Sequence, residues 1–98
     1  MHNKTMENAL TYEWDDAKAE ANLAKHDVAF DAMHFFEWET AVEVVDDRFD
    51  YGEERFIAYG FIGVRLHVCA YTMRGEAIRV ISLRKANKKE IQAYEQAS

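Results

Sequence analysis

Two arginines and a serine stand close together in the C-terminal third of the chain, and such side chains are typical of sites that bind phosphate. Arg79 and Ser82 lie inside a short apolar run, residues 78–83, and Arg84 follows that run. A guanidinium inside a strand of a small protein is costly unless it meets an anion or reaches water. Guanidinium groups bind phosphate and carboxylate through parallel hydrogen bonds. We therefore expect an anion-binding site at the end of this strand.

Other polar residues could complete a site that cleaves RNA. When the 2′-hydroxyl of the substrate attacks the phosphate, the enzyme supplies a base, a proton donor for the leaving 5′-oxygen and positive charge. His26 could transfer protons near neutral pH, and Glu54 could act as a base. Arg79 and Arg84 could stabilise the developing charge, and Lys25 could neutralise phosphate. The remaining substrate-binding candidates are polar residues of the expected strands and of the basic segment after them: Arg55, Thr72, Ser82 and Lys85.

Strand alternation predicts which of these side chains lie together. In the simplest hairpin register Arg55 lies opposite Thr72, and the next strand brings Arg79 near both. The same alternation places Arg79 and Ser82 on opposite faces, unless a bulge intervenes. Arg84 lies beyond the strand, where the last helix is expected to begin. The pattern thus predicts one cluster on the sheet and one arginine at its rim.

The same residues also have structural explanations. Arg79 could form a salt bridge with one of the many N-terminal acids, and Glu54 could be a solvated partner of Arg55. His26 could cap the carbonyl groups at a helix end, where a cation is favourable. These alternatives stay open at the level of the sequence.

Metal and cofactor chemistry is not expected. The four histidines have no metal-ligand spacing, and one cysteine does not suggest a zinc site. The sequence contains neither a glycine-rich phosphate loop nor a Gly-x-Ser-x-Gly motif. The aromatic residues Phe30, Phe35, Phe36 and Trp38 are more typical of a core or a partner-binding surface than of a platform for stacking bases.

The elements that must position these residues follow the order strand, helix, helix, four strands, helix. Helices on one face of an antiparallel meander make an α+β fold. The expected elements are a strand over residues 10–14, a helix from residue 15 or 16 to 26, a short helix that buries Phe30, Met33 and Phe36, a strand with Val42, Val44 and Val45, strands over 55–62, 65–72 and 77–83, and a helix over 85–97.

Helical spacing also predicts which residues the outer helices bury. The first helix has a narrow face of small apolar residues: Ala17, Ala21, Leu23 and Ala24. The last helix has Ile91 and Tyr94 as its buried pair. Gly63 fits the first central position of a two-residue hairpin turn.

Length and composition predict a single domain over residues 1–98, with residues 1–9 flexible. The chain is 49% hydrophobic, which excludes a disordered protein. No apolar run approaches the roughly 20 residues of a membrane span, and the polar N-terminus does not resemble a signal peptide. The single Cys69 indicates a buried thiol in a reducing, cytoplasmic setting.

The formal net charge of −6 is unevenly distributed. Residues 1–64 carry five Lys or Arg against fifteen Asp or Glu, a net charge of −10. Residues 65–98 carry seven Lys or Arg against three Glu, a net charge of +4. A basic C-terminal third suits an anionic ligand. The alternative is that these charges only solvate the surface.

Motifs over about residues 10 to 95 resemble the BrnT toxins, and their combination is more specific than any one of them. The motifs are Tyr12-Glu13-Trp14-Asp15 with Lys18, Asn22 and Lys25-His26; Val28-Ala29-Phe30-Asp31-Ala32; Glu54-Arg55 at the start of a strand; and Arg79-Val80-Ile81-Ser82-Leu83-Arg84-Lys85-Ala86 with Tyr94 behind it.

This resemblance implies a fold similar to RelE-type ribonuclease toxins and the toxin half of a type II toxin–antitoxin pair. It implies a metal-independent endoribonuclease that cleaves RNA and arrests growth. The implied partner is a BrnA-like ribbon-helix-helix antitoxin, through which alone operator DNA is contacted. The family's recurrent polar residues correspond here to Lys25, His26, Glu54, Arg55, Arg79, Ser82 and Arg84. The alternative function is a non-catalytic module of the same fold that binds protein or nucleic acid.

Overall fold

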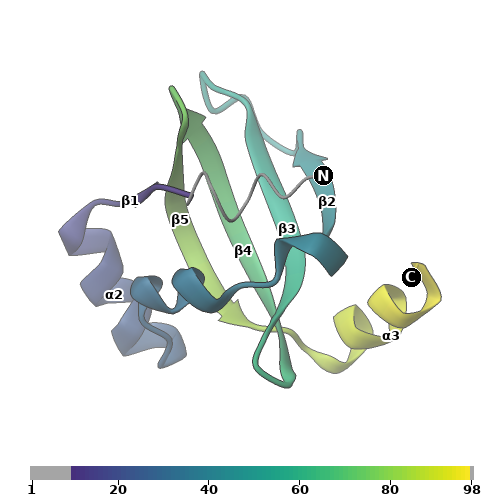
Figure 1. Ribbon diagram of the computed structural model, residues 1–98. Helices are drawn as coiled ribbons and strands as arrows, with labels where there is room; N and C mark the ends of the chain where they lie inside the picture. The colour runs from purple at the N-terminus through teal and green to yellow at the C-terminus, as the bar shows by residue number, and fades with distance from the viewer. Residues whose placement is uncertain (1–9, 98) are drawn as a thin grey trace.

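A computed structural model describes residues 10–97, and the flexibility expected for residues 1–9 lies outside the described residues. The described chain forms a five-stranded sheet in the order β1-β5-β4-β3-β2 (Figure 1). Its strands are β1 (Tyr12–Glu13), β2 (Val42–Asp46), β3 (Arg55–Ile62), β4 (Arg65–Arg74) and β5 (Ala77–Lys85). Strands β2 to β5 form an antiparallel meander, whereas β1 pairs with β5 in parallel. The mixed α+β class is therefore confirmed.

Helix α2 (Asp16–His26) begins and ends where the sequence predicts. Asp15 caps its N-terminus, and its carboxylate accepts a hydrogen bond from the backbone N–H of Ala17 at 2.8 Å. The chain leaves the helix at Asp27, which adopts the left-handed conformation with a φ of 60°.

The buried face of α2 differs from the prediction, because a polar residue makes the main contact with the sheet. The residues expected to be buried are exposed: Ala17, Ala21, Leu23 and Ala24. Asn22 is buried instead, and its Nδ2 donates hydrogen bonds to the carbonyls of Leu83 at 2.8 Å and Val28 at 3.0 Å. Its Oδ1 accepts from the Leu83 N–H at 3.2 Å. Asn22 thus pairs with the edge of β5 as a neighbouring strand would, which apolar patterning cannot reveal.

The side of the sheet toward the viewer in Figure 1 is the core face. Two 3₁₀ helices cross it, η1 (Phe30–Phe35) and η2 (Trp38–Thr40). The predicted burial of Phe30, Met33 and Phe36 is confirmed. The short helix expected here is therefore present, and it is a 3₁₀ helix whose period fits their spacing of three residues. They pack against buried sheet residues: Ala58, Cys69, Tyr71, Ile78, Val80 and Leu83.

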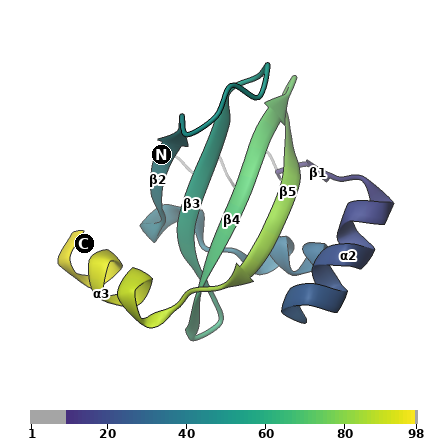
Figure 2. The ribbon, with the colours of Figure 1, turned by 180° about the vertical axis from the view of Figure 1, so that it is seen from behind.

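The opposite side, toward the viewer in Figure 2, is the open face. Of the described helices, α3 (Lys88–Ala97) packs on this side, at one end of the sheet. Tyr94 is buried as predicted, and its hydroxyl donates to the Thr40 carbonyl at 2.7 Å. Ile91 is half-buried. The open face carries the polar candidates of the strands: Arg55, Thr72, Arg79, Ser82 and Arg84. Apolar and aromatic residues of β3 and β4 also lie on this face, and some of them pack against α3: Ile57, Tyr59, Phe61, Leu66, Val68 and Ala70.

Strand β5 is longer, and the last helix starts later, than the sequence predicts. Strand β5 continues to Lys85, and α3 starts at Lys88. Asn87 caps the helix: its Oδ1 accepts from the Glu90 N–H at 2.8 Å, and the Glu90 carboxylate accepts from the Asn87 N–H at 2.9 Å. This reciprocal capping box fixes the start of the helix.

A bulge in β5 changes which of its residues share a face. Ala70 pairs with Ser82, but Tyr71 pairs with Val80, so Ile81 is an extra residue in β5. The inserted residue reverses the alternation on either side of it.

The bulge corrects the prediction that Arg79 and Ser82 lie on opposite faces. Arg79 pairs with Thr72, and Ser82 pairs with a residue two positions away on the same strand, so both point to the open face. Arg84 lies on this face too.

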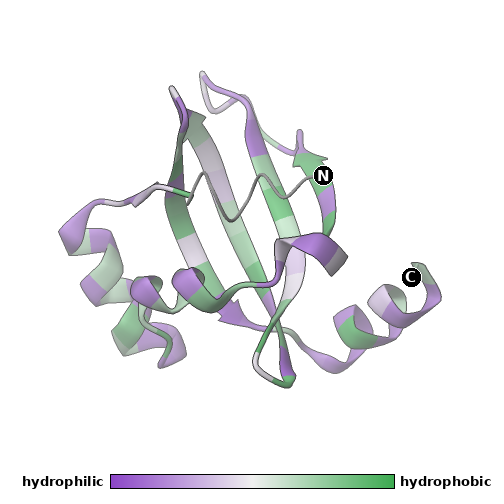
Figure 3. Ribbon diagram, viewed as in Figure 1, coloured by the Kyte–Doolittle hydropathy of each residue, from purple (hydrophilic) through white to green (hydrophobic). Residues whose placement is uncertain are grey.

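Hydropathy follows the same layers. In Figure 3 the green, hydrophobic colours concentrate on the strands, whereas α2 and α3 mix purple with green. Over residues 10–97, no helix combines the length and the apolar character needed to cross a membrane.

Candidate functional site

The first group of candidate residues forms a row across three strands at one end of the open face. Arg55 pairs with Thr72, and Thr72 pairs with Arg79, as the hairpin register predicts. Neighbouring strands lie about 4.8 Å apart, so the row is compact. The Thr72 side chain is buried, and its hydroxyl donates to the Glu54 carbonyl at 2.7 Å. The Thr72 hydroxyl therefore uses its proton to bind the backbone just before β3, and the two arginines are the charged side chains of the row.

Both arginines of this row already contact a carboxylate. Arg79 Nη1 donates to Glu13 Oε2 at 2.9 Å, which agrees with the salt-bridge explanation considered for Arg79. Arg55 Nε lies 3.3 Å from Glu53 Oε2, and its guanidinium lies over the ring of Tyr51 at 4.0 Å from the centroid. The positive charges of Arg55 and Arg79 are therefore each paired with a carboxylate of the same chain.

Arg84 lies farther along β5 and is held by α3. Its two terminal nitrogens donate to the two oxygens of Glu90, each at 2.8 Å. These hydrogen bonds raise the pKa of Arg84 and lower the pKa of Glu90. The bidentate geometry is the one that a guanidinium uses for phosphate as well as for carboxylate. Glu90 thus holds the Arg84 guanidinium in a fixed orientation.

A cleft of about 230 Å³ lies between α2 and β5 and brings several candidate residues together. Lys25 and His26 from the end of α2 line it with Ser82 from β5. Lys18, about two turns earlier in α2, adds a third basic side chain. We call these four residues the basic cleft: Lys18, Lys25, His26 and Ser82. The cleft opens next to Asn22, which joins α2 to β5.

The charges around the cleft act on His26. Burial lowers its pKa, and the nearby cations Lys25 and Arg84 lower it further. The neutral imidazole is therefore favoured at neutral pH. A neutral imidazole beside cations can accept a proton from a hydroxyl, which is what a general base must do. Arg84 is thus electrostatically coupled to the basic cleft.

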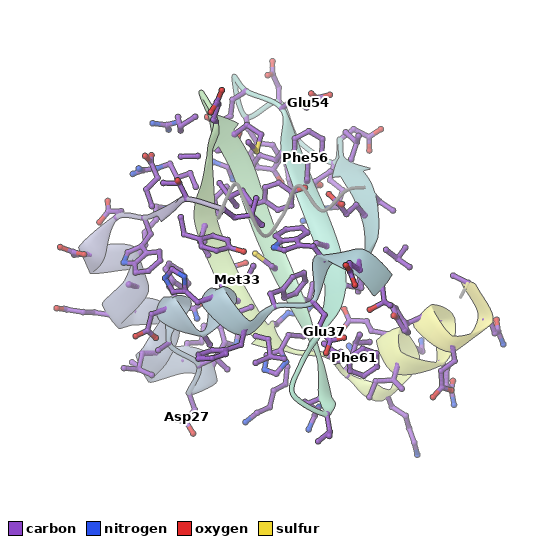
Figure 4. The ribbon with its side chains drawn as sticks, viewed as in Figure 1. Asp27, Met33, Glu37, Glu54, Phe56 and Phe61 are labelled. Carbon is purple, nitrogen blue, oxygen red and sulfur yellow. The ribbon has the colours of Figure 1, made fainter. Side chains whose placement is uncertain are left out.

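Two of the sequence candidates lie elsewhere. Glu54 is exposed at the start of β3, at the end of the sheet remote from Phe61 (Figure 4). Lys85 pairs with His67, so its side chain leaves β5 on the side opposite Arg84. The structure therefore brings Glu54 and Lys85 neither to the basic cleft nor to each other.

Several residues of the site were missed at the level of sequence. The carboxylates that hold the arginines, Glu13, Glu53 and Glu90, have no signature that predicts their partners. For Glu90 one contact could have been predicted: Asn87 lies three residues before it, and this spacing is typical of a capping box. In the part of the chain that the structure describes, no group of three or more His, Cys, Asp or Glu residues could hold a metal ion.

A comparison with protein families gives one match that covers most of the chain. Residues 14–90 match a family described as "Ribonuclease toxin, BrnT, of type II toxin-antitoxin system". This range includes both the basic cleft and the arginines of the open face. No curated protein matches the chain.

Proposed function

Because the chain belongs to the BrnT family of type II ribonuclease toxins, we propose that it is a RelE-like endoribonuclease that cleaves RNA through the substrate's 2′-hydroxyl without a metal ion. We also propose that the whole chain acts as one toxin domain in the cytoplasm. Its inhibitor in this proposal is a BrnA-like ribbon-helix-helix antitoxin, which alone contacts operator DNA.

One observation supports this assignment most strongly. The bulge at Ile81 turns Arg79, Ser82 and Arg84 to the same face, while α2 brings Lys25 and His26 beside Ser82. Proton-transfer, hydroxyl and cationic groups then surround one shallow surface. Cleavage by the 2′-hydroxyl requires these three kinds of group.

In the proposed reaction, neutral His26 accepts the proton of the 2′-hydroxyl as the oxygen attacks phosphorus. The imidazolium that results can then return a proton to the leaving 5′-oxygen. Arg84 and Lys25 stabilise the charge that builds on the phosphate oxygens, and Ser82 donates a hydrogen bond to one of them. Arg55 and Arg79 bind a flanking phosphate of the same strand. Glu54 and Lys85 receive no role in the reaction, because their side chains lie away from the cleft.

The test is cleavage of a defined RNA by the purified protein in the presence of a metal chelator. We expect cleavage to persist in the chelator and to fall by about 10²-fold or more in His26→Ala, the range typical of a lost general acid or base. Arg84→Ala should also lower the rate. His34→Ala, a change at an exposed histidine of η1, and Lys88→Ala, at an exposed lysine of α3, are the matched controls. Loss of cleavage in the chelator, or full activity of His26→Ala, would contradict the proposed mechanism.

A second candidate function is a binding module of the same fold that lacks catalysis. It is favoured by the carboxylate partners that Arg55, Arg79 and Arg84 already have. In this case the chain would be harmless on expression without a partner and would leave RNA intact. Growth arrest by the wild-type chain that is relieved in His26→Ala would support the endoribonuclease over the binding module.

A further inference from the structure

The arginines of the open face are paired with acids of the same chain, and the proposed reaction gives these acids no role. Arg84 is held by Glu90 through two 2.8 Å contacts, and Arg79 is held by Glu13 at 2.9 Å. Carboxylate and phosphate oxygens accept the same forked hydrogen bonds from guanidinium. A phosphate that approaches either arginine therefore competes with a resident carboxylate.

We propose that Glu13 and Glu90 occupy the phosphate-binding positions of Arg79 and Arg84 in the free protein, and that RNA phosphates replace them on binding. This inference rests on the proposed function. It assigns the two glutamates a competitive role: they lower the affinity for weakly bound anions and leave the arginines pre-positioned. RNA, which presents several linked phosphates, can replace both carboxylates together.

Glu90 can leave Arg84 without becoming an unpaired buried acid. Its Oε1 also accepts from the Asn87 N–H at 2.9 Å in the capping box. Its side chain is 19% exposed, so it has a partial route to water. Release of Arg84 therefore costs Glu90 one partner and leaves the helix cap in place.

Glu13 can leave Arg79 still more readily. It lies in the two-residue strand β1, and its side chain is 40% exposed. Exposed ion pairs of this kind contribute little, because water and salt compete with them. A phosphate that accepts two hydrogen bonds from Arg79 is a sufficient competitor.

The test measures binding of a fluorescent, uncleavable 2′-O-methyl oligouridine of about 12 nucleotides, within the range that small single-strand sites cover. Glu90→Gln and Glu13→Gln each remove one carboxylate charge, and glutamine at position 90 still suits the capping box. Glu39→Gln is the matched control, because Glu39 is an exposed glutamate of η2 whose change removes the same charge. The carboxylates that contact Arg79 and Arg84 are those of Glu13 and Glu90.

We expect Glu90→Gln and Glu13→Gln to bind the oligonucleotide about three- to fivefold more tightly than Glu39→Gln at low salt, the factor expected when a weak competing ion pair is removed. The gain of Glu90→Gln should vanish when Arg84→Ala is combined with it. Equal affinities of the three glutamine variants, or a gain that persists without Arg84, would overturn the inference.

Two further variants separate this inference from the proposed function. If Arg84→Ala and Arg79→Ala weaken binding but the glutamine variants show no gain, the arginines bind phosphate and only the competition is refuted. If neither arginine variant weakens binding, the phosphate assignment of the proposed function fails, and the competition fails with it.

Discussion

At the scale of single residues, Asn22 is a buried polar side chain that joins α2 to β5. It is buried and makes hydrogen bonds with both backbone groups of Leu83 and with the Val28 carbonyl. Its amide supplies the hydrogen-bond partners of the Leu83 N–H and C=O at the free edge of β5. The basic cleft depends on the same contact, because Asn22 holds α2 beside Ser82.

Asn22→Ala should therefore lower the free energy of unfolding by about 2–4 kcal/mol, since the buried N–H and C=O groups lose their partners. Urea denaturation followed by circular dichroism measures the change. Glu20→Ala, at an exposed position of the same helix, is the control and should change stability by less than about 0.5 kcal/mol. A similar small effect for Asn22→Ala would show that water replaces the amide.

The coupling between Arg84 and His26 is a second prediction for single residues. Because the cation lowers the pKa of His26, Arg84→Met should raise that pKa, and NMR titration of the imidazole measures it. Lys85→Met is the control: it removes the same charge from the next residue, whose side chain lies on the other face of the sheet. It should raise the pKa of His67, which Lys85 helps to lower, and leave His26 unchanged. An unchanged His26 in Arg84→Met would contradict the electrostatic coupling.

At the scale of elements, the sequence predicts the strands β3 to β5 and the register of the β3–β4 hairpin well, because turn residues and alternation are local signals. Three features could not be predicted. The bulge at Ile81 has no glycine to mark it, and α2 buries a polar residue where periodicity favours an apolar face. The segment after Phe30 has no capping side chain or glycine that would distinguish a 3₁₀ helix from an α-helix.

The contact between β3 and Phe36, the residue after η1, depends on a glycine. A Cβ at Gly60 would lie 2.5 Å from Phe36 Cζ, and Phe36 forms a bridge with Ile62 of the same strand. Gly60→Ala should therefore destabilise the fold by about 1–3 kcal/mol through overpacking. The change is measured by thermal unfolding. Adding Phe36→Leu should recover part of the loss, whereas additive losses would show that the ring is not the obstacle.

The loop after β2 is fixed by an ion pair that acid should break. Hydrogen bonds from Arg48 hold the pKa of Asp46 at about 2, below its ordinary value of 3.8. Its stabilisation is therefore fully present above about pH 4 and is lost as the pH falls toward 2. Asp46→Asn should therefore be less stable than the wild type at neutral pH. Between about pH 4 and pH 2 it should lose less stability than the wild type does. Asp47→Asn, next to it and exposed, should keep the wild-type slope in acid denaturation curves.

At the scale of the whole molecule, the two faces of the sheet differ in the residues that they carry. The core face holds the largest buried side chains, and the open face holds the arginines. The sequence predicts the row of Arg55, Thr72 and Arg79 because that row needs only hairpin register. It could not predict the basic cleft, because the cleft requires the bulge and the Asn22 contact together. Glu13, from the acidic N-terminal part of the sequence, contacts Arg79 from the basic C-terminal part. The acidic and basic parts of the sequence therefore meet on the open face.

This division makes the single cysteine a reporter of global unfolding. Cys69 is 0% exposed in the central strand β4, on the core face, and burial raises the pKa of its thiol. Movement of α2 or α3 alone leaves it covered by η1, so a thiol reagent should label it at least about 10³-fold more slowly than in the unfolded chain. Asn22→Ala should speed labelling in proportion to its loss of stability. Cys69→Ala with Val64→Cys is the control, since position 64 is 98% exposed and should label at once. Rapid labelling of native Cys69 would mean that η1 detaches from the sheet while the strands remain paired.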